Sequence, residues 1–424
     1  MAKKYKLKRA LGLRDTTLYG IGIILGAGIY ALLGSGAGVT GNSIWISFAL
    51  SAVIAVLTGL SYAELSSMYP KEAAEYNYTK NAIRVRSVAF MVGWVLIISV
   101  ILSASTVAIG FAGYLSHLIG GEITLIAVGL LAILTFINYR GIKESSRFNT
   151  VSTLIEVSGL VLIIAAAIFI SGNTNTDFFE MKNGFAGVIS ATALIFFAYI
   201  GFEDIANVSE ETKNARKVIP KALMLSIAIS TILYMLVSVS AVAMVGSERL
   251  AASKAPLAEA ISSTIPNAGI LMSLIALFST SNTVLIMLVS GSRIMYGMSS
   301  QKDFPKALSR ICRRGTPLYA VLATGAFSIV GVFIGGLETV ALFTTIGIFI
   351  SYLFVNISLI ILRYREPMKK RPFKAPLNVG KFPLVAFLGA ATCAAMLLYF
   401  DTTIVMMEAA VIAIGAVAYI MMKR

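Results

Sequence analysis

Two features of the sequence could do chemistry in an apolar environment, and the first is a glycine-rich run. The run is GAGIY at positions 26–30, in the middle of the apolar stretch 16–37. A helix so rich in glycine is easily broken. A break would free backbone N–H groups and carbonyls that lipid cannot satisfy and that a bound polar solute or ion could satisfy. The plainer interpretation is that these glycines let a neighbouring helix approach closely.

A break at Gly26 would offer two kinds of backbone group to a zwitterion. The segment after the break begins with a positive dipole end, and the N–H groups of Ala27, Gly28 and Ile29 would suit a carboxylate. The segment before the break ends in free carbonyls, which suit an ammonium group. Because these contacts come from the backbone, they would recognise the shared core of an α-amino acid and not its side chain.

The second feature is a single acid, Glu156, in the apolar stretch 148–171. It follows Arg147 by nine residues, which at 1.5 Å per residue places it roughly 13 Å into a hydrocarbon layer about 30 Å thick. A carboxylate near the midplane costs several kcal/mol unless it is paired or protonated, so such acids are functional candidates. The alternative role is a permanently protonated acid that hydrogen-bonds between helices.

Glu156 is therefore the predicted coupling residue. We expect it to take up a proton, or else to hold a cation such as Na⁺. In the second case the further ligands would be carbonyls near Gly22 and Leu25 and a hydroxyl such as Ser279 or Ser281.

Composition places these features in a polytopic membrane protein. The 424 residues are 58% hydrophobic and only 13% charged, and the mean hydropathy of +0.86 excludes a soluble globular domain of this size. The net charge of +15 lies in loops between apolar segments, so we expect a lipid bilayer and no nucleic acid as partner. One histidine and scattered acids predict no catalytic residue and no metal site. The sequence contains no phosphate-binding loop, so nothing in it points to the use of ATP.

The chain is predicted to be an all-α membrane protein with twelve transmembrane helices. Of its 35 lysine and arginine residues, 32 lie on the side of the N-terminus, so both termini are predicted to be cytoplasmic, and the membrane is predicted to be the plasma membrane. The predicted spans are 16–37, 42–67, 87–116, 122–139, 148–171, 184–207, 221–246, 268–298, 317–335, 337–362, 382–399 and 402–422.

Spans one and six occupy matching positions if spans one to five and six to ten form two halves. Because five is odd, the second half must be inverted relative to the first. Span six is also interrupted, since Gly201, Glu203 and Asp204 fall inside an otherwise apolar helix. Paired interrupted helices in inverted halves are the best sequence pointer to a transporter's central site. This pairing favours the broken helix over the close-packing interpretation of the glycine run.

These residues resemble the amino acid–polyamine–organocation transporters over nearly the whole chain, which implies the leucine-transporter fold: a 5+5 inverted repeat with broken helices 1 and 6. Two departures lie in loops, where Ala74 and Glu75 replace a common pair of glycines and Ala215 replaces a proline. The motifs that carry the resemblance are GAGI at 26–29, YAEL at 62–65, YNY at 76–78, GW at 93–94, AYIGF at 198–202, EETKN at 210–214, GSR at 291–293 and RPF at 371–373.

The resemblance implies further site residues. The carbonyls that bind the ammonium group of the substrate would be those of Ile24, Phe197, Ala198 and Ile200. The family often has a lysine where this chain has Glu156. Candidates for side-chain selectivity are Ser99, Phe197, Phe202 and Phe278. Because cationic-amino-acid members can carry an acid at the position of Ser99, the serine favours neutral substrates.

Charged residues on the cytoplasmic side are predicted to form an inner gate. Glu64, Glu203, Glu210 and Glu211 face a side crowded with basic residues, namely Arg84, Arg86, Arg216 and Arg293. Glu203 could instead meet a cationic substrate side chain. The alternative is solvated surface charge worth under about 1 kcal/mol for each pair.

Together these observations predict a secondary active transporter that imports neutral α-amino acids by alternating access, with H⁺ favoured over Na⁺ and no cofactor. An exchanger, a cationic amino acid or polyamine carrier and a non-transporting amino acid sensor stay open, as do a monomer and a homodimer. The predicted parts are a tail at 1–15, a transport core at 16–362 with repeats 16–171 and 184–362, a basic loop at 363–381 and two peripheral helices at 382–424.

Overall fold

Each of the twelve apolar stretches predicted from the sequence contains a helix in the computed structural model, which describes residues 7–170, 176–253, 255–265, 267–333 and 337–423. The predicted span ends at 171 and 335 and residues 1–6 of the tail lie outside the described residues. The helices are α1 (Leu13–Thr40), α2 (Ile44–Met68), α4 (Arg86–Ile119), α5 (Ile123–Arg140), α6 (Ile142–Ile170), α7 (Gly184–Ile195), α8 (Ala215–Ala252), α10 (Ala268–Ser300), α11 (Leu318–Gly331), α12 (Leu337–Arg365), α13 (Leu384–Leu397) and α14 (Thr402–Lys423).

Nine stretches of the described residues are long and apolar enough to cross a membrane. Helices α11 and α13 are apolar but have only 14 residues each. At 1.5 Å per residue they cover about 21 Å, which is less than the hydrocarbon thickness of about 30 Å. The chain is therefore a multi-pass membrane protein.

Several short elements were not predicted. In the loops lie helix α3 (Ala74–Ile83), helix α9 (Pro256–Ser262) and an antiparallel hairpin of β1 (Asn378–Val379) and β2 (Phe382–Pro383). The 3-10 helices are η1 (Gly41–Ser43), η3 (Phe196–Tyr199), η4 (Phe202–Glu211) and η5 (Lys306–Ser309).

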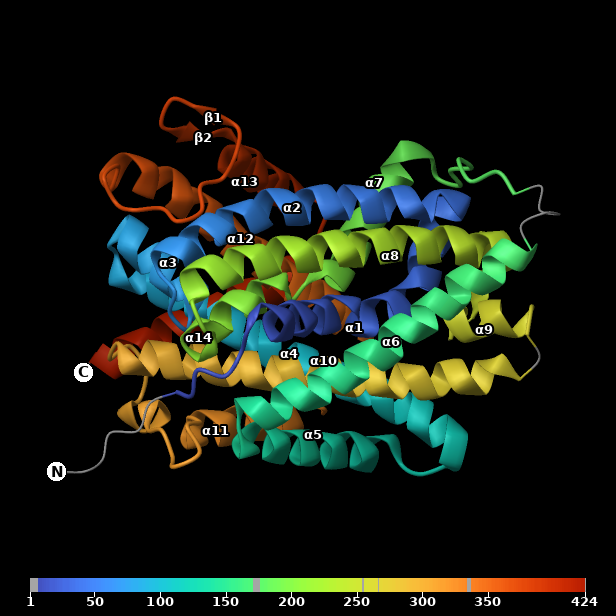
Figure 1. Cartoon of the computed structure of the whole chain (residues 1–424), viewed down its shortest axis with the longest axis horizontal. Coiled ribbons are helices and arrows are strands. Elements are labelled where there is room, and N and C mark those ends of the chain that lie inside the picture. The colour runs from blue at the N-terminus through green and yellow to red at the C-terminus, as the bar shows by residue number, and fades with distance from the viewer. Residues whose placement is uncertain (1–6, 171–175, 254, 266, 334–336, 424) are drawn as a thin grey trace.

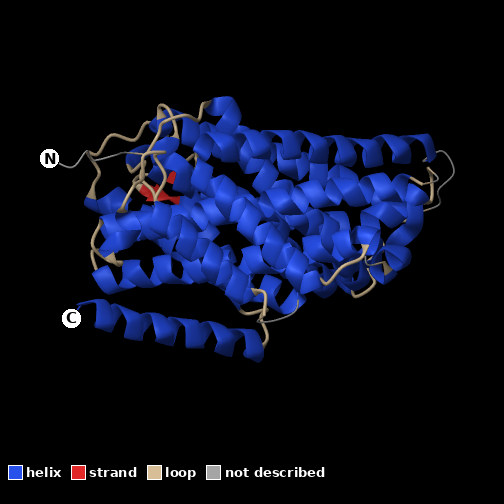
Figure 2. Ribbon diagram, turned by 90° about the horizontal axis from the view of Figure 1, so that it is seen from below, coloured by secondary structure: helices blue, strands red, loops and turns tan. Residues whose placement is uncertain are grey.

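The long helices lie side by side along the long axis of the molecule (Figure 1). Helix α1 packs along α8, and α4 packs along α10. Helix α14 lies along one edge (Figure 2), where it packs on α4 and α12. The first described residues, the end of α14 and the β1–β2 hairpin all lie at one end of the bundle (Figures 1 and 2).

Candidate functional site

The predicted breaks in spans one and six are confirmed by the backbone. Inside α1, Gly26 has φ −25° and ψ −147°, which is not helical. In span six, α7 and η3 end at an extended Ile200, and Gly201 has φ +117°, a conformation that favours glycine. Helix η4 begins at Phe202, directly after the break.

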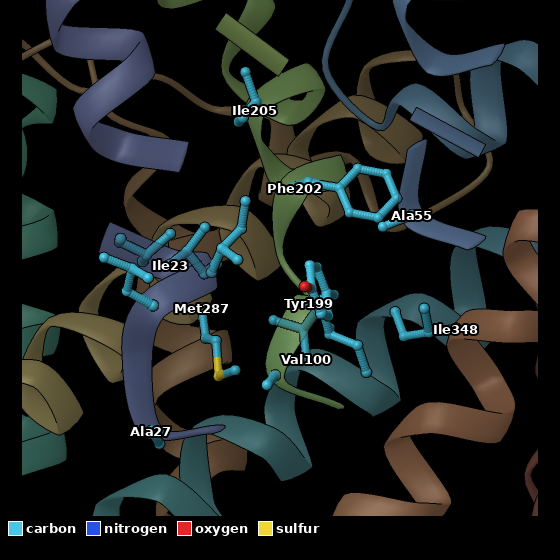
Figure 3. Close-up of a cluster of buried hydrophobic side chains, with 14 of the residues drawn as sticks. Ile23, Ala27, Ala55, Val100, Tyr199, Phe202, Ile205, Met287 and Ile348 are labelled. Carbon is cyan, nitrogen blue, oxygen red and sulfur yellow. The ribbon is translucent and has the colours of Figure 1, made fainter. Parts of the chain in front are cut away.

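The two breaks lie against each other. A Cβ built on Gly28 would lie 2.4 Å from the Cα of Ala198, so only glycine allows this approach of the two backbones. Both interpretations of the glycine run therefore hold, because Gly26 breaks α1 and Gly28 lets the second broken segment approach. Apolar side chains, Ile23, Val100 and Met287 among them, surround the two segments (Figure 3).

The carbonyls predicted for an ammonium group already have partners. The hydroxyl of Tyr234 on α8 lies 2.8 Å from the carbonyl oxygen of Ala198 and also hydrogen-bonds that of Ile24. A hydroxyl has one proton, so it can donate to only one of the two carbonyls at a time. The carbonyl of Phe197 accepts from the N–H of Ile200 at 3.2 Å. The prediction of a loose carbonyl is therefore wrong for Phe197 in this conformation, whereas only one of the Ile24 and Ala198 carbonyls can accept from Tyr234 at a time.

On the other side of the α1 break, the N–H of Ala27 donates to Oγ1 of Thr283 on α10 at 3.3 Å. The same Thr283 Oγ1 would lie 2.0 Å from a Cβ on Gly26, so α10 packs directly against the break. Ile29 is fully buried behind it. Neither Thr283 nor Tyr234 was among the predicted site residues.

The predicted selectivity residues have different environments. Phe202 is buried and lies edge-on to Tyr62 and tilted against Tyr352, with ring centroids 5.8 and 5.1 Å away. Phe197 is half-buried in η3. Ser99 is buried against Gly347 of α12, and its hydroxyl has no hydrogen-bond partner. Phe278 is 42% exposed on the outside of α10, so its predicted place in the site is wrong.

Glu156 is buried in α6 with one polar contact. Its Oε1 accepts from the hydroxyl of Ser279 on α10 at 2.5 Å, and its Oε2 has no hydrogen-bond partner. The structure does not bring Ser281 to Glu156, because the Ser281 hydroxyl donates to the Phe278 carbonyl within its own helix at 3.0 Å. Of the two predicted hydroxyls, only Ser279 contacts the acid.

A polar cluster lies one turn from Glu156 along the α6–α10 interface. Nδ2 of Asn282 donates to the Gly22 carbonyl at 3.3 Å and to Oδ1 of Asn149 at 3.1 Å, with Thr153 Oγ1 3.4 Å away. Gly22 thus lies near the predicted coupling residue but already accepts a hydrogen bond. Leu25, in the next turn of α1, is fully buried.

Two predicted gate acids form buried ion pairs. Glu211 accepts from Nε and Nη2 of Arg293 at 2.9 and 3.1 Å, and Asn138 accepts from Nη1 of the same arginine at 2.9 Å. Glu64 pairs with Arg363 at 2.6 Å and with Arg371 at 3.0 Å. Arg363 and Arg371 replace Arg84, Arg86 and Arg216, which were the predicted partners along with Arg293.

The other two gate acids are arranged differently. Oε2 of Glu203 accepts from the N–H of Gly201 at 2.9 Å and from the hydroxyl of Tyr352, so Glu203 is part of the buried break and is not solvated. Glu210 is in none of the ion pairs between described residues, so its prediction as an ion-pair partner is wrong. Its N–H donates to Oε1 of Glu72 at 3.0 Å.

Glu75, one of the two departures from the family's glycines, is a buried acid in α3, which is not among the spanning helices. It accepts from Tyr62 at 3.0 Å and from Asn207 at 3.3 Å. Burial raises its pKa from 4.5 to about 7. The folded protein therefore favours the neutral acid and loses stability as pH rises from about 4.5 to about 7.

Glu75→Gln is accordingly expected to stabilise the protein at pH 8, by on the order of 2 kcal/mol, and to change little at pH 4.5. The measurement is the difference in melting temperature between variant and wild type at the two pH values in one detergent. Glu122→Gln is the control, because hydrogen bonds from Leu125 and Thr124 lower the pKa of Glu122, and it should give no gain. An equal effect of Glu75→Gln at both pH values would contradict the prediction.

Comparison with known proteins identifies the family of this chain. The profile of the amino acid permease family matches residues 11–422, so the chain belongs to that family. It is a membrane transporter of the amino acid permease type and not an enzyme.

Three relatives show the breadth of the family. The chain is 31% identical over 443 residues to the branched-chain amino acid permease BcaP of Bacillus subtilis, covering 99% of this chain and 94% of that protein. It is 29% identical to the methylthioribose transporter of the same organism, covering 92% and 88%. It is also 29% identical to the mitochondrial cationic amino acid transporter 3 of Arabidopsis thaliana, covering 88% of this chain and 65% of that one.

Proposed function

We propose that this chain is a proton-coupled transporter that imports neutral α-amino acids with apolar side chains by alternating access. The observation that carries the proposal is the contact of two broken helices, where Gly28 meets Ala198 in a buried apolar setting. Broken backbone at this depth is tolerated where it lines a binding cavity. An exchanger and a Na⁺-coupled carrier are the main alternatives.

The backbone groups at the breaks are the proposed recognition elements for the α-amino and α-carboxyl groups. The N–H groups of Ala27, Gly28 and Ile29 begin the second half of α1 and suit the carboxylate, for which the Ala27 N–H would give up its bond to Thr283 Oγ1. The carbonyls of Ile24 and Ala198 share one donor, the Tyr234 hydroxyl. Because that hydroxyl can serve only one of them at a time, the other is available to the ammonium group.

The surroundings of the breaks favour an apolar side chain. Figure 3 shows Val100, Met287, Phe202 and Ile348 around the two segments, and all four are buried. The nearby acid Glu203 is already hydrogen-bonded, which disfavours a cationic side chain. The 31% identity to a branched-chain amino acid permease supports the same substrate class.

Glu156 is the proposed coupling residue. One carboxylate with a single hydroxyl partner offers few oxygen ligands for a metal cation, whereas a proton needs only one acceptor. The Gly22 carbonyl, the other predicted cation ligand with an observed contact, already accepts from Asn282. Both observations favour H⁺ over Na⁺.

The proposed topology has twelve spans, with both termini in the cytoplasm and the protein in the plasma membrane. Helices α1 to α6 and α7 to α12 would form the two inverted halves of the core, and α13 and α14 a peripheral pair. The ion pairs of Glu211 with Arg293 and of Glu64 with Arg363 would close the cytoplasmic gate. They lie toward the end of the bundle that holds the β1–β2 hairpin.

Counterflow into proteoliposomes tests the substrate class independently of coupling. Vesicles preloaded with unlabelled leucine are diluted into labelled leucine, and other solutes are added outside as competitors. Valine and isoleucine should compete, whereas arginine and methylthioribose should not. Counterflow of arginine but not of leucine would contradict the proposal, and a protein that binds leucine without counterflow would be a sensor.

A further inference from the structure

A basic pocket lies at the end of the bundle where α12 ends and the β1–β2 hairpin begins. It has a volume of about 290 Å³, and five cationic side chains line it: Arg363, Lys369, Arg371, Lys374 and Lys381. The remaining lining residues, Pro367 and Gly380, are uncharged. None of these residues belongs to the broken-helix site.

The pocket holds more positive charge than its acidic neighbours balance. Glu64 accepts from Arg363 and Arg371, and Glu366 pairs with Lys369 at 2.9 Å. Lys374 and Lys381 are exposed and are in none of the ion pairs between described residues. Five cations therefore face two carboxylates.

One buried donor in the pocket wall lacks an acceptor. Arg363 is only 5% exposed, and its Nε has no hydrogen-bond partner although its Nη2 binds Glu64 at 2.6 Å. A buried unpaired donor is costly, and an anion in the pocket would supply the missing acceptor. Arginine suits a phosphate because its planar fork matches phosphate oxygens.

Apolar side chains beside the pocket point to a lipid source for that anion. Met368 is 94% exposed, Val379 70% and Leu377 63%, and all three lie in the same segment as the cations. This segment joins two apolar helices, α12 and α13, so it must run along the membrane surface. Exposed apolar residues next to lysines are typical of segments that sit in the interface of an anionic leaflet.

We propose that this pocket binds the phosphate of an anionic phospholipid headgroup, with Met368, Leu377 and Val379 in the adjacent interface. Basic pockets at the cytoplasmic ends of membrane helices bind such headgroups. The bound phosphate would lie beside the ion pairs that hold Glu64 of α2 to Arg363 of α12. Lipid binding would thus strengthen the packing of two helices on the cytoplasmic side.

Native mass spectrometry of the purified protein tests this proposal. The protein is titrated with phosphatidylglycerol and, separately, with phosphatidylcholine. Wild type should prefer phosphatidylglycerol. The variant Lys374→Gln/Lys381→Gln should bind it about 30-fold more weakly, which is about fivefold for each lysine.

The control is Lys213→Gln/Lys217→Gln, which removes the same charge from exposed residues outside the pocket. It should bind phosphatidylglycerol like wild type, and both variants should keep the wild-type melting temperature in detergent. Equal loss of binding in the two variants, or no loss in either, would overturn the proposal.

A second experiment replaces the lipid with inorganic phosphate. If phosphate binds as tightly as the lipid and its binding depends on Lys374 and Lys381 in the same way, the pocket binds a soluble anion and the lipid assignment is wrong.

Discussion

Gly28→Ala is expected to lower uptake by about 100-fold in proteoliposomes. The new Cβ would lie 2.4 Å from the Cα of Ala198, and backbone atoms cannot yield as the end of a flexible side chain can. The two broken segments would have to separate by about 1 Å, and a displacement of that size in a site costs on the order of 100-fold in rate. The measurement is the initial rate of labelled leucine uptake.

The matched control is Gly113→Ala in α4. A Cβ there meets nothing within 4 Å, so the same chemical change occurs in a helix with open space. Uptake by the control should equal that of wild type. The prediction fails if Gly28→Ala elutes as a folded protein and keeps more than half of the wild-type rate.

Glu156→Gln is expected to abolish accumulation driven by a pH gradient while leaving counterflow intact. Glutamine has the same size and can still accept from the Ser279 hydroxyl, so packing between α6 and α10 should survive. It cannot take up a proton. For one proton per substrate, a pH difference of one unit supplies about 1.4 kcal/mol, or tenfold accumulation. Wild type should approach that ratio, and the variant should equilibrate at a ratio of one.

Glu408→Gln is the control for this experiment. Glu408 is also a buried glutamate in an apolar helix, and neither of its oxygens has a hydrogen-bond partner, but it lies in the peripheral α14. Its replacement should leave accumulation unchanged. Accumulation by Glu156→Gln equal to that of wild type would show that the proton binds elsewhere.

The parts of the site that the sequence predicts are those with local signals. Glycines at 26 and 28 and an acid at 156 contrast with the apolar residues around them, so their unusual role can be inferred without knowing what they contact. The same is true of Gly201 in span six, where the backbone adopts φ +117°. In each case the sequence alone shows a residue that is unfavourable in a lipid-facing helix.

The parts that were missed depend on distant contacts. Tyr234 donates to the carbonyl of Ile24, which lies 210 residues away in the sequence, and Thr283 accepts from the N–H of Ala27, which lies 256 residues away. A tyrosine or threonine in an apolar span is ordinary, so nothing local marks either residue. The partners of Glu64 were missed for the same reason, because Arg363 lies 299 residues away.

Two other errors have different causes. Phe278 was placed in the site, but it is exposed, whereas its neighbour Ser279 contacts Glu156. Adjacent residues on a helix differ by about 100°, and the sequence does not show which face of α10 turns inward, because the five residues after Phe278 are all polar and cover every face of the helix. Helix α3 was missed because Ala73 and Arg84 take left-handed conformations at its ends, where glycine would normally mark the boundary.

The measurement that tests the central claim most directly is accumulation of labelled leucine by wild-type proteoliposomes under three conditions: an inward-directed proton gradient, an inward-directed Na⁺ gradient, and neither. We expect uptake above equilibrium with the proton gradient alone. Accumulation driven only by Na⁺ would contradict proton coupling and make Glu156 a cation ligand. Equal uptake in all three conditions, dependent on amino acid preloaded inside, would make the protein an exchanger and Glu156 a structural acid.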